Sequence, residues 1–270
     1  MITAKVAIGV VALGAVVIAV NELHWRGTVD ESARRRESAK VLGYLSPAML
    51  PNLVPLLPPP PKPGSIAMER DERARQGALL LKGTRLYAIA AADAVRAQPN
   101  TVAGFECAFG TGIDMNRTPT LYNMLSRIRL DVRAASYAAK RHFARPRPFA
   151  LNNVHSCYRD DEDMVRNDGS YPSARGSVGW AFAIVLAHLR PERRHAIVGR
   201  AHQFAQSRVV CDQEWQSDVD AARTVALVVV SRELTQAAFR TDMAVARNEV
   251  AAELALGVKP AAVCEGNLPG

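Results

Sequence analysis

Basic and hydroxyl side chains in three separated segments have the types and order needed to bind a phosphoryl group. The first segment contributes Lys140 and Arg147, the second Ser173 and the third Arg208. The oxygens of a phosphomonoester carry two negative charges and spread further charge during transfer. Guanidinium forks, a lysine charge and a hydroxyl donor therefore stabilise such a group. These residue types predict a pocket for phosphate or a phosphomonoester.

Two acids and one further arginine belong to the same segments. Arg175 lies two residues after Ser173. Glu214 and Asp218 follow Arg208 by six and ten residues. A helical spacing of four would place Glu214 and Asp218 on one face, where they repel unless a cation intervenes. We therefore predict that Glu214 forms an ion pair with Arg175 inside the pocket.

The order and spacing of these segments resemble the signature of the class A bacterial non-specific acid phosphatases, within the type 2 phosphatidic acid phosphatase and vanadium haloperoxidase superfamily. In that signature the second segment reads Pro-Ser-Gly-His, and the third reads Ser-Arg, five residues, His, three residues and Asp. The second segment of this chain reads Pro172-Ser173-Ala174-Arg175. The similarity covers roughly residues 56–249, including the stretches 116–119, 168–173, 190–192 and 215–220.

The resemblance implies a role for each matching position. In an active family member the third-segment histidine attacks phosphorus, and the aspartate holds that histidine in the correct tautomer. The second-segment histidine protonates the leaving oxygen. By position, the four residues of the predicted pocket match phosphate-binding residues, and Asp218 matches the orienting aspartate. Glu214 stands at the nucleophile position and Arg175 at the proton-donor position.

Neither replacement preserves the chemistry of histidine. The pKa of an arginine lies above ~12, so Arg175 cannot serve as a proton donor at ordinary pH. An ionised Glu214 repels a phosphate dianion unless surrounding cations offset the repulsion. We therefore predict an acid-phosphatase-family protein that recognises phosphate or phosphomonoesters, with weak or lost hydrolysis and no metal or cofactor.

Three alternatives stay open at the level of sequence. Glu214 could act as a nucleophile in an active phosphomonoesterase and form an acyl phosphate, as carboxylates do in other phosphotransferases. Glu214, Asp218 and Asp212 could collect a divalent cation for metal-assisted hydrolysis. The pocket could also serve another anion or a non-hydrolytic reaction, because a fold does not fix function.

Composition and charge favour one compact domain with a small anionic partner. The chain has 270 residues, 49% of them hydrophobic, which is enough to bury a sizeable core. Its formal charge is +8, but its longest basic run is Arg34 to Arg36, and no nucleic-acid-binding signature is present. Nucleic acid is therefore not an expected partner. A small-molecule phosphoester is expected, and the sequence leaves a homo-oligomer open.

The first 26 residues are expected to be a signal peptide or an N-terminal membrane anchor. Lys5 precedes a run over residues 6–20 that is apolar apart from two glycines. With Ile2 the stretch approaches the ~20 residues that span a bilayer. The small residues of a cleavage site are poorly represented before residue 21. The body is therefore expected to be periplasmic or secreted, and attachment to the inner membrane stays open.

Four cysteines stand at positions 107, 157, 211 and 264. Their spacing is not that of a zinc site, and export would permit two disulfides whose pairing the sequence does not give. Cys211 lies close to the third segment. A bridge there would brace the pocket, and a buried free thiol is an equal alternative.

Helices are expected to position the three segments. Apolar residues recur at three- and four-residue spacing over residues 74–97, 120–143, 177–189, 193–206 and 217–245. Strand signals are nearly absent, so we predict an all-α, compact helical bundle, which by resemblance is of the acid phosphatase and haloperoxidase type. A proline-dense stretch over residues 45–65 is expected to be extended.

These observations divide the chain into four parts. Residues 1–26 form the signal peptide or anchor. Residues 27–64 form a helical and proline-rich strap or linker. Residues 65–257 form the acid-phosphatase-like helical domain, and residues 258–270 form a tail.

Overall fold

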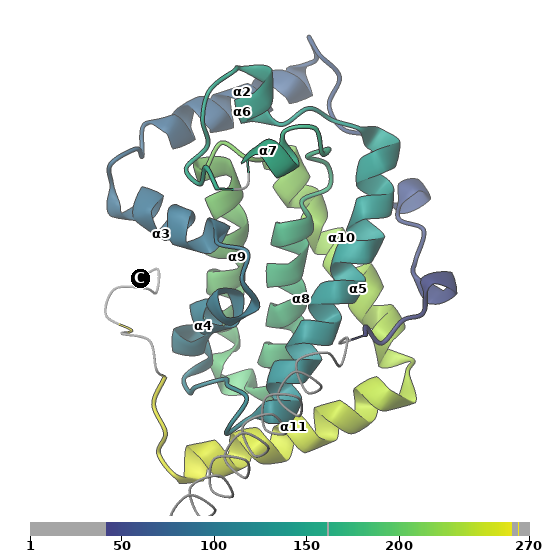
Figure 1. Cartoon of the computed structure of the whole chain (residues 1–270), viewed down its shortest axis with the longest axis vertical. Coiled ribbons are helices and arrows are strands. Elements are labelled where there is room, and N and C mark those ends of the chain that lie inside the picture. The colour runs from purple at the N-terminus through teal and green to yellow at the C-terminus, as the bar shows by residue number, and fades with distance from the viewer. Residues whose placement is uncertain (1–41, 161, 261–263, 265–270) are drawn as a thin grey trace, which may run out of the picture. The chain divides into compact units, whose positions relative to one another are not determined.

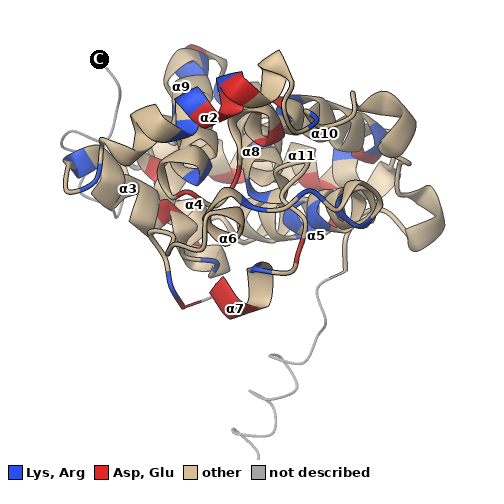
Figure 2. Cartoon of the chain, turned by 90° about the horizontal axis from the view of Figure 1, so that it is seen from above, with Lys and Arg blue, Asp and Glu red and all other residues tan. Residues whose placement is uncertain are grey.

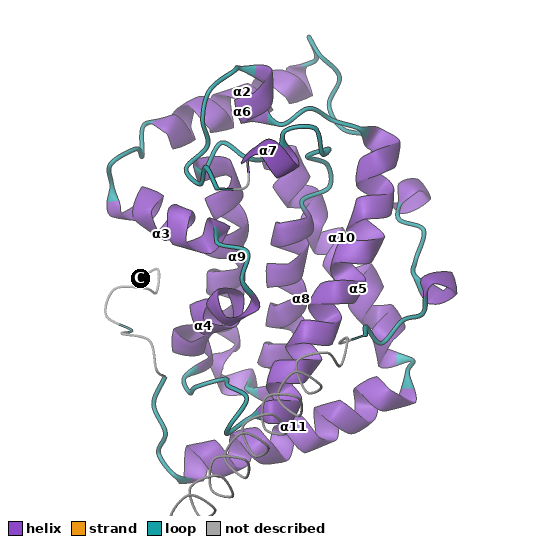
Figure 3. Cartoon of the chain, in the orientation of Figure 1, coloured by secondary structure: helices purple, strands orange, loops and turns teal. Residues whose placement is uncertain are grey.

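Helices form where apolar residues recur along one face and where hydroxyl residues, proline or glycine stand at the ends. The computed structural model describes residues 42–160, 162–260 and 264. In the described residues no strand occurs, so the predicted all-α fold is confirmed (Figures 1 and 3). The elements are η1 (Pro47–Met49), η2 (Val54–Leu56), α2 (Ile66–Leu79), α3 (Arg85–Ala94), α4 (Gln98–Phe109), α5 (Pro119–Phe143), α6 (Pro148–Leu151), α7 (Glu162–Val165), α8 (Ala174–Leu189), η3 (Pro191–Arg193), α9 (Arg194–Val210), α10 (Gln216–Leu234) and α11 (Ala237–Ala255).

Helix α8 is the central element of the bundle. Its apolar residues occupy every face, as expected for a helix that is buried on all sides. It packs against α5, α9 and α10 (Figure 1). Gly179 permits the close approach of α9, because a Cβ at this position would lie 2.5 Å from the ring of Phe204. Since a short connection joins α8 to α9, Ser173 at the start of α8 lies at the same end as Arg208 near the end of α9.

The start of α8 is capped by a hydroxyl side chain. Ser173 is the N-cap residue, and its hydroxyl accepts a hydrogen bond from the Gly176 backbone N–H at 2.9 Å. This arrangement satisfies one of the donors that a helix start leaves without a partner. The helix predicted over residues 177–189 is therefore present and begins about one turn earlier, at Ala174.

Two predicted helices are interrupted, and α4 and the two short helices α6 and α7 were missed. The segment predicted over residues 74–97 contains a break between α2 and α3, where Gly83 has a left-handed backbone with φ of +84° and Thr84 caps α3. The segment predicted over residues 217–245 breaks between α10 and α11 at Thr235 and Gln236. Helix α4 was not predicted, because Pro99, Asn100 and Gly104 give it little helical signal.

The proline-dense stretch lies against the bundle and contains the two short turns η1 and η2. Leu53 and Leu57 are buried in the main hydrophobic core. The hydroxyl of Tyr171 donates to the Pro58 carbonyl oxygen at 2.6 Å. These contacts hold the proline-dense stretch next to the second segment, which contains Ser173.

The four cysteines form two disulfides, Cys157–Cys211 and Cys107–Cys264. The bridge predicted as one option at Cys211 is therefore present, and the free thiol is wrong. The Cys211 sulfur also lies 3.2 Å from the carbonyl oxygen of Ala90 in α3. The end of α9 is thus fixed to the loop that precedes the second segment.

The predicted signal peptide or anchor lies outside the described residues. Within residues 42–160 and 162–260, no helix combines the length and apolar character that a bilayer span requires.

Candidate anion-binding site

The Glu214 carboxylate lies at the centre of the predicted phosphate pocket. Its Oε1 is 3.7 Å from Lys140 Nζ and 3.5 Å from Arg147 Nη1. Its Oε2 is 3.3 Å from Arg208 Nε and accepts a hydrogen bond from Ser173 Oγ at 2.5 Å. All four residues predicted to bind phosphate therefore contact this one carboxylate. We call these four residues the cage.

The cage and its carboxylate come from five different parts of the fold. Lys140 lies in the last turn of α5, Arg147 caps α6, Ser173 caps α8 and Arg208 lies in the last turn of α9. Glu214 lies in the connection between α9 and α10. Each of the five residues is at most 3% exposed. Burial reduces the screening of these charges by water. Removing the carboxylate, or the cations around it, would therefore leave buried charge uncompensated and would destabilise the folded state considerably.

The surrounding charges determine the protonation state of the site. Burial alone raises the pKa of Glu214, but Arg208, Lys140 and Arg147 together lower it to about 2. Burial, with a contribution from Arg147, lowers the pKa of Lys140 to about 8. At neutral pH the carboxylate is therefore ionised and the lysine keeps most of its charge.

Two cage cations also hold the backbone of the second segment. Lys140 Nζ donates to the carbonyl oxygens of Gly169 and Ser170, both at 2.7 Å. Arg147 Nη2 donates to the Gly169 carbonyl oxygen at 3.2 Å. The backbone at Gly169 comes so close that a Cβ would lie 2.8 Å from the Lys140 carbonyl oxygen. The cage thus fixes the loop that leads to Ser173.

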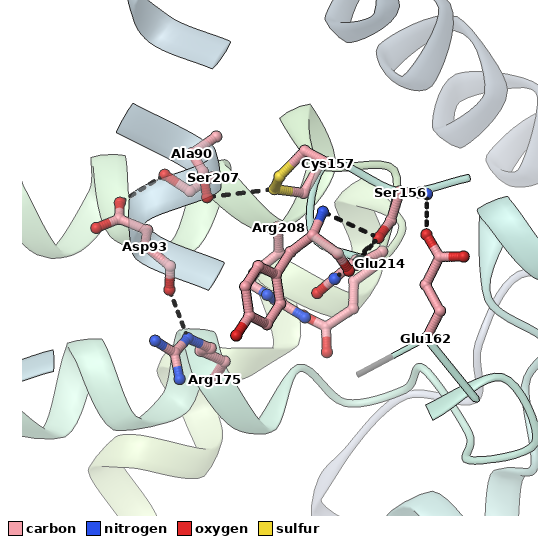
Figure 4. Close-up of a disulfide and its surroundings, with 12 residues drawn as sticks. Ala90, Asp93, Ser156, Cys157, Glu162, Arg175, Ser207, Arg208 and Glu214 are labelled. Carbon is pink, nitrogen blue, oxygen red and sulfur yellow. Dashed lines mark hydrogen bonds and ion pairs between the residues drawn. A yellow bond between two sulfur atoms is a disulfide. The ribbon is translucent and has the colours of Figure 1, made fainter. Parts of the chain in front are cut away.

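Arg175 lines the same pocket but has other partners than the one predicted. Its guanidinium donates to the Asp93 carbonyl oxygen at 2.8 Å (Figure 4) and also to the Val95 carbonyl oxygen. Burial, followed by the charge of Arg208, lowers the pKa of Arg175 to about 9. The predicted Glu214–Arg175 ion pair is wrong, because these carbonyl groups hold the guanidinium while the cage surrounds the carboxylate.

The carboxylate of Asp218 pairs with a cation that does not belong to the cage. Its carboxylate lies 2.6 Å from Arg145 Nη1 and accepts the backbone N–H of Trp215 at 2.7 Å. It therefore caps the first turn of α10. Glu214 precedes that helix, so the prediction that helical spacing places the two acids on one face is also wrong.

Sequence reasoning missed Arg145. This buried guanidinium bridges Asp71 of α2 and Asp218, with both N–O distances 2.6 Å, and lies 5.3 Å from the centre of the Trp215 ring. The Arg-Pro-Arg-Pro stretch contained the signal. It supplies two arginines in close succession, and both Arg145 and Arg147 are buried.

The three acids that could have formed a metal site are each paired with cations, and these cations differ from one acid to the next. Asp212 pairs with Arg75 at 2.7 Å, Asp218 pairs with Arg145, and Glu214 faces the cage. Across the residues that the structure describes, no three His, Cys, Asp or Glu side chains gather as metal ligands. Because cations already pair with these three carboxylates, the arrangement disfavours metal-assisted hydrolysis.

The cage opens into a pocket in which arginines predominate. The space that admits the centre of a water-sized sphere is about 30 Å³, room for roughly two waters. A phosphate therefore needs the Glu214 side chain to move before it can fill the cage. The described residues that line the pocket are Arg96, Thr101, Arg129, Arg133, Tyr137, Lys140, Arg147, Ala174, Arg175, Val178, Arg208 and Glu214.

Comparison with known proteins identifies the family to which this all-α bundle and its cage belong. Residues 123–241 match the family model of the PAP2 superfamily. Relatives that are 36% identical over 78% and 81% of this chain show that, within that superfamily, it belongs to the non-specific acid phosphatases.

Three relatives support this membership. The chain is 36% identical to the non-specific acid phosphatase of Providencia stuartii, over 78% of this chain and 85% of the relative. It is also 36% identical to the non-specific acid phosphatase of Salmonella typhi, over 81% and 88% of the two chains. It is 32% identical to the acid phosphatase of Zymomonas mobilis, over 72% and 74%.

Proposed function

We propose that this chain is an exported acid-phosphatase-family protein that binds phosphate or phosphomonoesters and has lost most or all hydrolysis. One observation carries the proposal. Lys140, Arg147, Ser173 and Arg208 all contact the carboxylate of Glu214. That carboxylate stands where the family resemblance implies a histidine nucleophile.

The environment of Glu214 makes it a poor nucleophile. Both carboxylate oxygens interact with cage residues, and a pKa of about 2 reflects how strongly the positive charges stabilise the anion. An attack on phosphorus would have to give up part of this stabilisation. The contacts therefore disfavour the acyl-phosphate alternative, in which Glu214 is the nucleophile.

Arg175 is equally unsuited to the role that its position implies. Its guanidinium donates to the Asp93 and Val95 carbonyl oxygens, and with a pKa of about 9 it stays protonated from acidic to neutral pH. The leaving oxygen of a phosphomonoester would lack the general acid that speeds its departure.

The charge balance of the cage nevertheless favours an anionic ligand. Lys140, Arg147 and Arg208 bring three positive charges, Glu214 supplies one negative charge between them, and Asp168 pairs with Arg147 at 3.4 Å from outside the cage. A phosphate dianion compensates these cations more fully than a single carboxylate does. We propose that phosphate binds as the Glu214 side chain leaves the cage.

Export is part of the proposal. The disulfides Cys157–Cys211 and Cys107–Cys264 suit an oxidising compartment such as the periplasm. The apolar run over residues 6–20 would direct the chain there.

The test is hydrolysis of an activated aryl phosphate by the full chain and by the Glu214→His/Arg175→His variant. The wild type should stay at background, and the double variant should gain turnover by roughly 10²-fold or more, since positioned acid–base groups contribute about that much. Each single variant serves as a matched control. Wild-type turnover that Glu214→Gln abolishes would contradict the proposal and favour Glu214 as the nucleophile.

A further inference from the structure

A row of side chains on α5 leads outward from the cage. Arg129, Arg133, Tyr137 and Lys140 follow one another at spacings of four, four and three residues, which places them on one face of the helix. All four line the pocket, and Arg96 joins them from the segment between α3 and α4. Figure 2 shows the basic residues along α5. We call Arg96, Arg129 and Arg133 the outer arginine cluster.

Neutral oxygen atoms hold two members of this cluster. Arg129 Nη2 donates to the Arg96 carbonyl oxygen at 3.0 Å. Arg133 Nη2 donates to the Tyr137 hydroxyl at 3.2 Å. Among the described residues that line the pocket, the single acid is Glu214, and it faces the cage. The lining therefore carries a large excess of positive charge.

The guanidinium groups of the outer arginine cluster also repel one another. Burial lowers the pKa of Arg129, and the charges of Arg133 and Arg96 lower it further. The acid Asp93 forms an ion pair with Arg200. Half-buried cations that repel one another raise the free energy of the folded state, and a bound polyanion would offset that cost.

We propose that the pocket binds a small molecule carrying at least two phosphate groups. One phosphate would lie in the cage and another between Arg129 and Arg133. The inference rests on the proposed function, because the first phosphate uses the cage. Lys140 follows Arg133 by seven positions along the helix, a rise of about 10 Å. Two long side chains that reach toward a common ligand can span this distance.

This ligand class also explains how the cage becomes available. Glu214 offers one carboxylate and cannot serve the cage and the outer arginine cluster together. A second phosphate gains charge-assisted hydrogen bonds that Glu214 does not replace. The additional binding energy favours displacement of the Glu214 side chain.

Calorimetric titration of the full chain with orthophosphate and with tripolyphosphate tests the inference. The variant is Arg129→Gln/Arg133→Gln. The matched control is Arg141→Gln/Arg194→Gln, which removes the same net charge from exposed positions outside the pocket lining. The wild type and the control should bind tripolyphosphate at least about tenfold more tightly than orthophosphate. The cluster variant should lose that preference and keep its orthophosphate affinity.

Other outcomes separate the inference from the proposed function. Equal wild-type affinity for both anions would overturn the inference, while orthophosphate binding would leave the proposed function standing. If the control variant lost the preference for tripolyphosphate to the same extent, the inference would also be overturned, because net charge would then explain the preference. If neither anion binds, the proposed function fails and the inference fails with it. If the double variant does not fold, Arg133→Gln alone is measured under the same criteria, since Arg133 bonds to Tyr137 within α5.

Discussion

The Nε of Arg208 lies 3.3 Å from Oε2 of Glu214, and five residues lie between them in the chain. The chain turns back after α9, and the backbone N–H of Glu214 donates to the Arg208 carbonyl oxygen at 3.2 Å. This turn delivers the carboxylate to a position between cations from α5 and α6. The protein thus carries its own anion inside an anion-binding cage.

Acid should weaken the fold through Glu214. Its pKa falls from 4.5 to about 2 on folding, so the folded state binds this proton less readily than the unfolded state. The resulting stability, on the order of 3 kcal/mol, is present above pH ~4.5 and is lost as pH falls toward ~2. Urea unfolding across this range measures it. Glu214→Gln should be less stable at pH 7 and should lack this part of the pH dependence, and parallel curves for the two proteins would contradict the assignment.

Anion affinity should fall as pH rises through about 8. Burial lowers the pKa of Lys140 to about 8, so the cage loses one positive charge in this range. Sulfate is the suitable probe because its own charge stays constant. Titrations between roughly pH 7 and 8.5, below the pKa of about 9 of Arg175, should show the decline in the wild type and a much smaller one in Lys140→Arg, which stays charged. A decline of equal size in a folded Lys140→Arg protein would assign the effect to another group.

Loss of the Cys157–Cys211 disulfide should affect both stability and binding. This bridge closes a separation of 54 residues, and the free energy of unfolding should fall by about 2–4 kcal/mol in Cys157→Ser/Cys211→Ser. Anion affinity should fall as well, because the bridge joins the end of α9 to the loop before the second segment. The Cys107→Ser/Cys264→Ser protein, whose bridge joins α4 to the C-terminal segment, should lose stability but keep its affinity. Similar affinity losses in both variants would argue against a specific bracing role.

The helical architecture was largely predictable from the sequence, because apolar spacing and helix-start residues are local signals. Ser173 at the start of α8 shows this, since its cap follows directly from a hydroxyl residue after proline. The break at Thr235 and Gln236 was not predicted, because neither proline nor glycine marks it and the apolar spacing continues across it.

The members of the cage were predictable from the sequence, but the partners of Glu214 and Arg175 were not. Order and spacing indicated which residues converge. Which cation meets which acid depends on tertiary packing, and Arg175 turns to carbonyl oxygens at the end of α3, far away in the sequence. Arg145 was missed for a related reason, because its partner Asp71 lies in a distant helix.

Orthophosphate affinity of the wild type and of Glu214→Gln, measured by calorimetry at pH 7 on proteins shown to be folded, tests most directly whether Glu214 takes the place of phosphate. Displacing a neutral amide breaks no ion pair, so the variant should bind orthophosphate at least about tenfold more tightly. Equal or weaker binding by the variant would contradict the occupation of the phosphate position by Glu214.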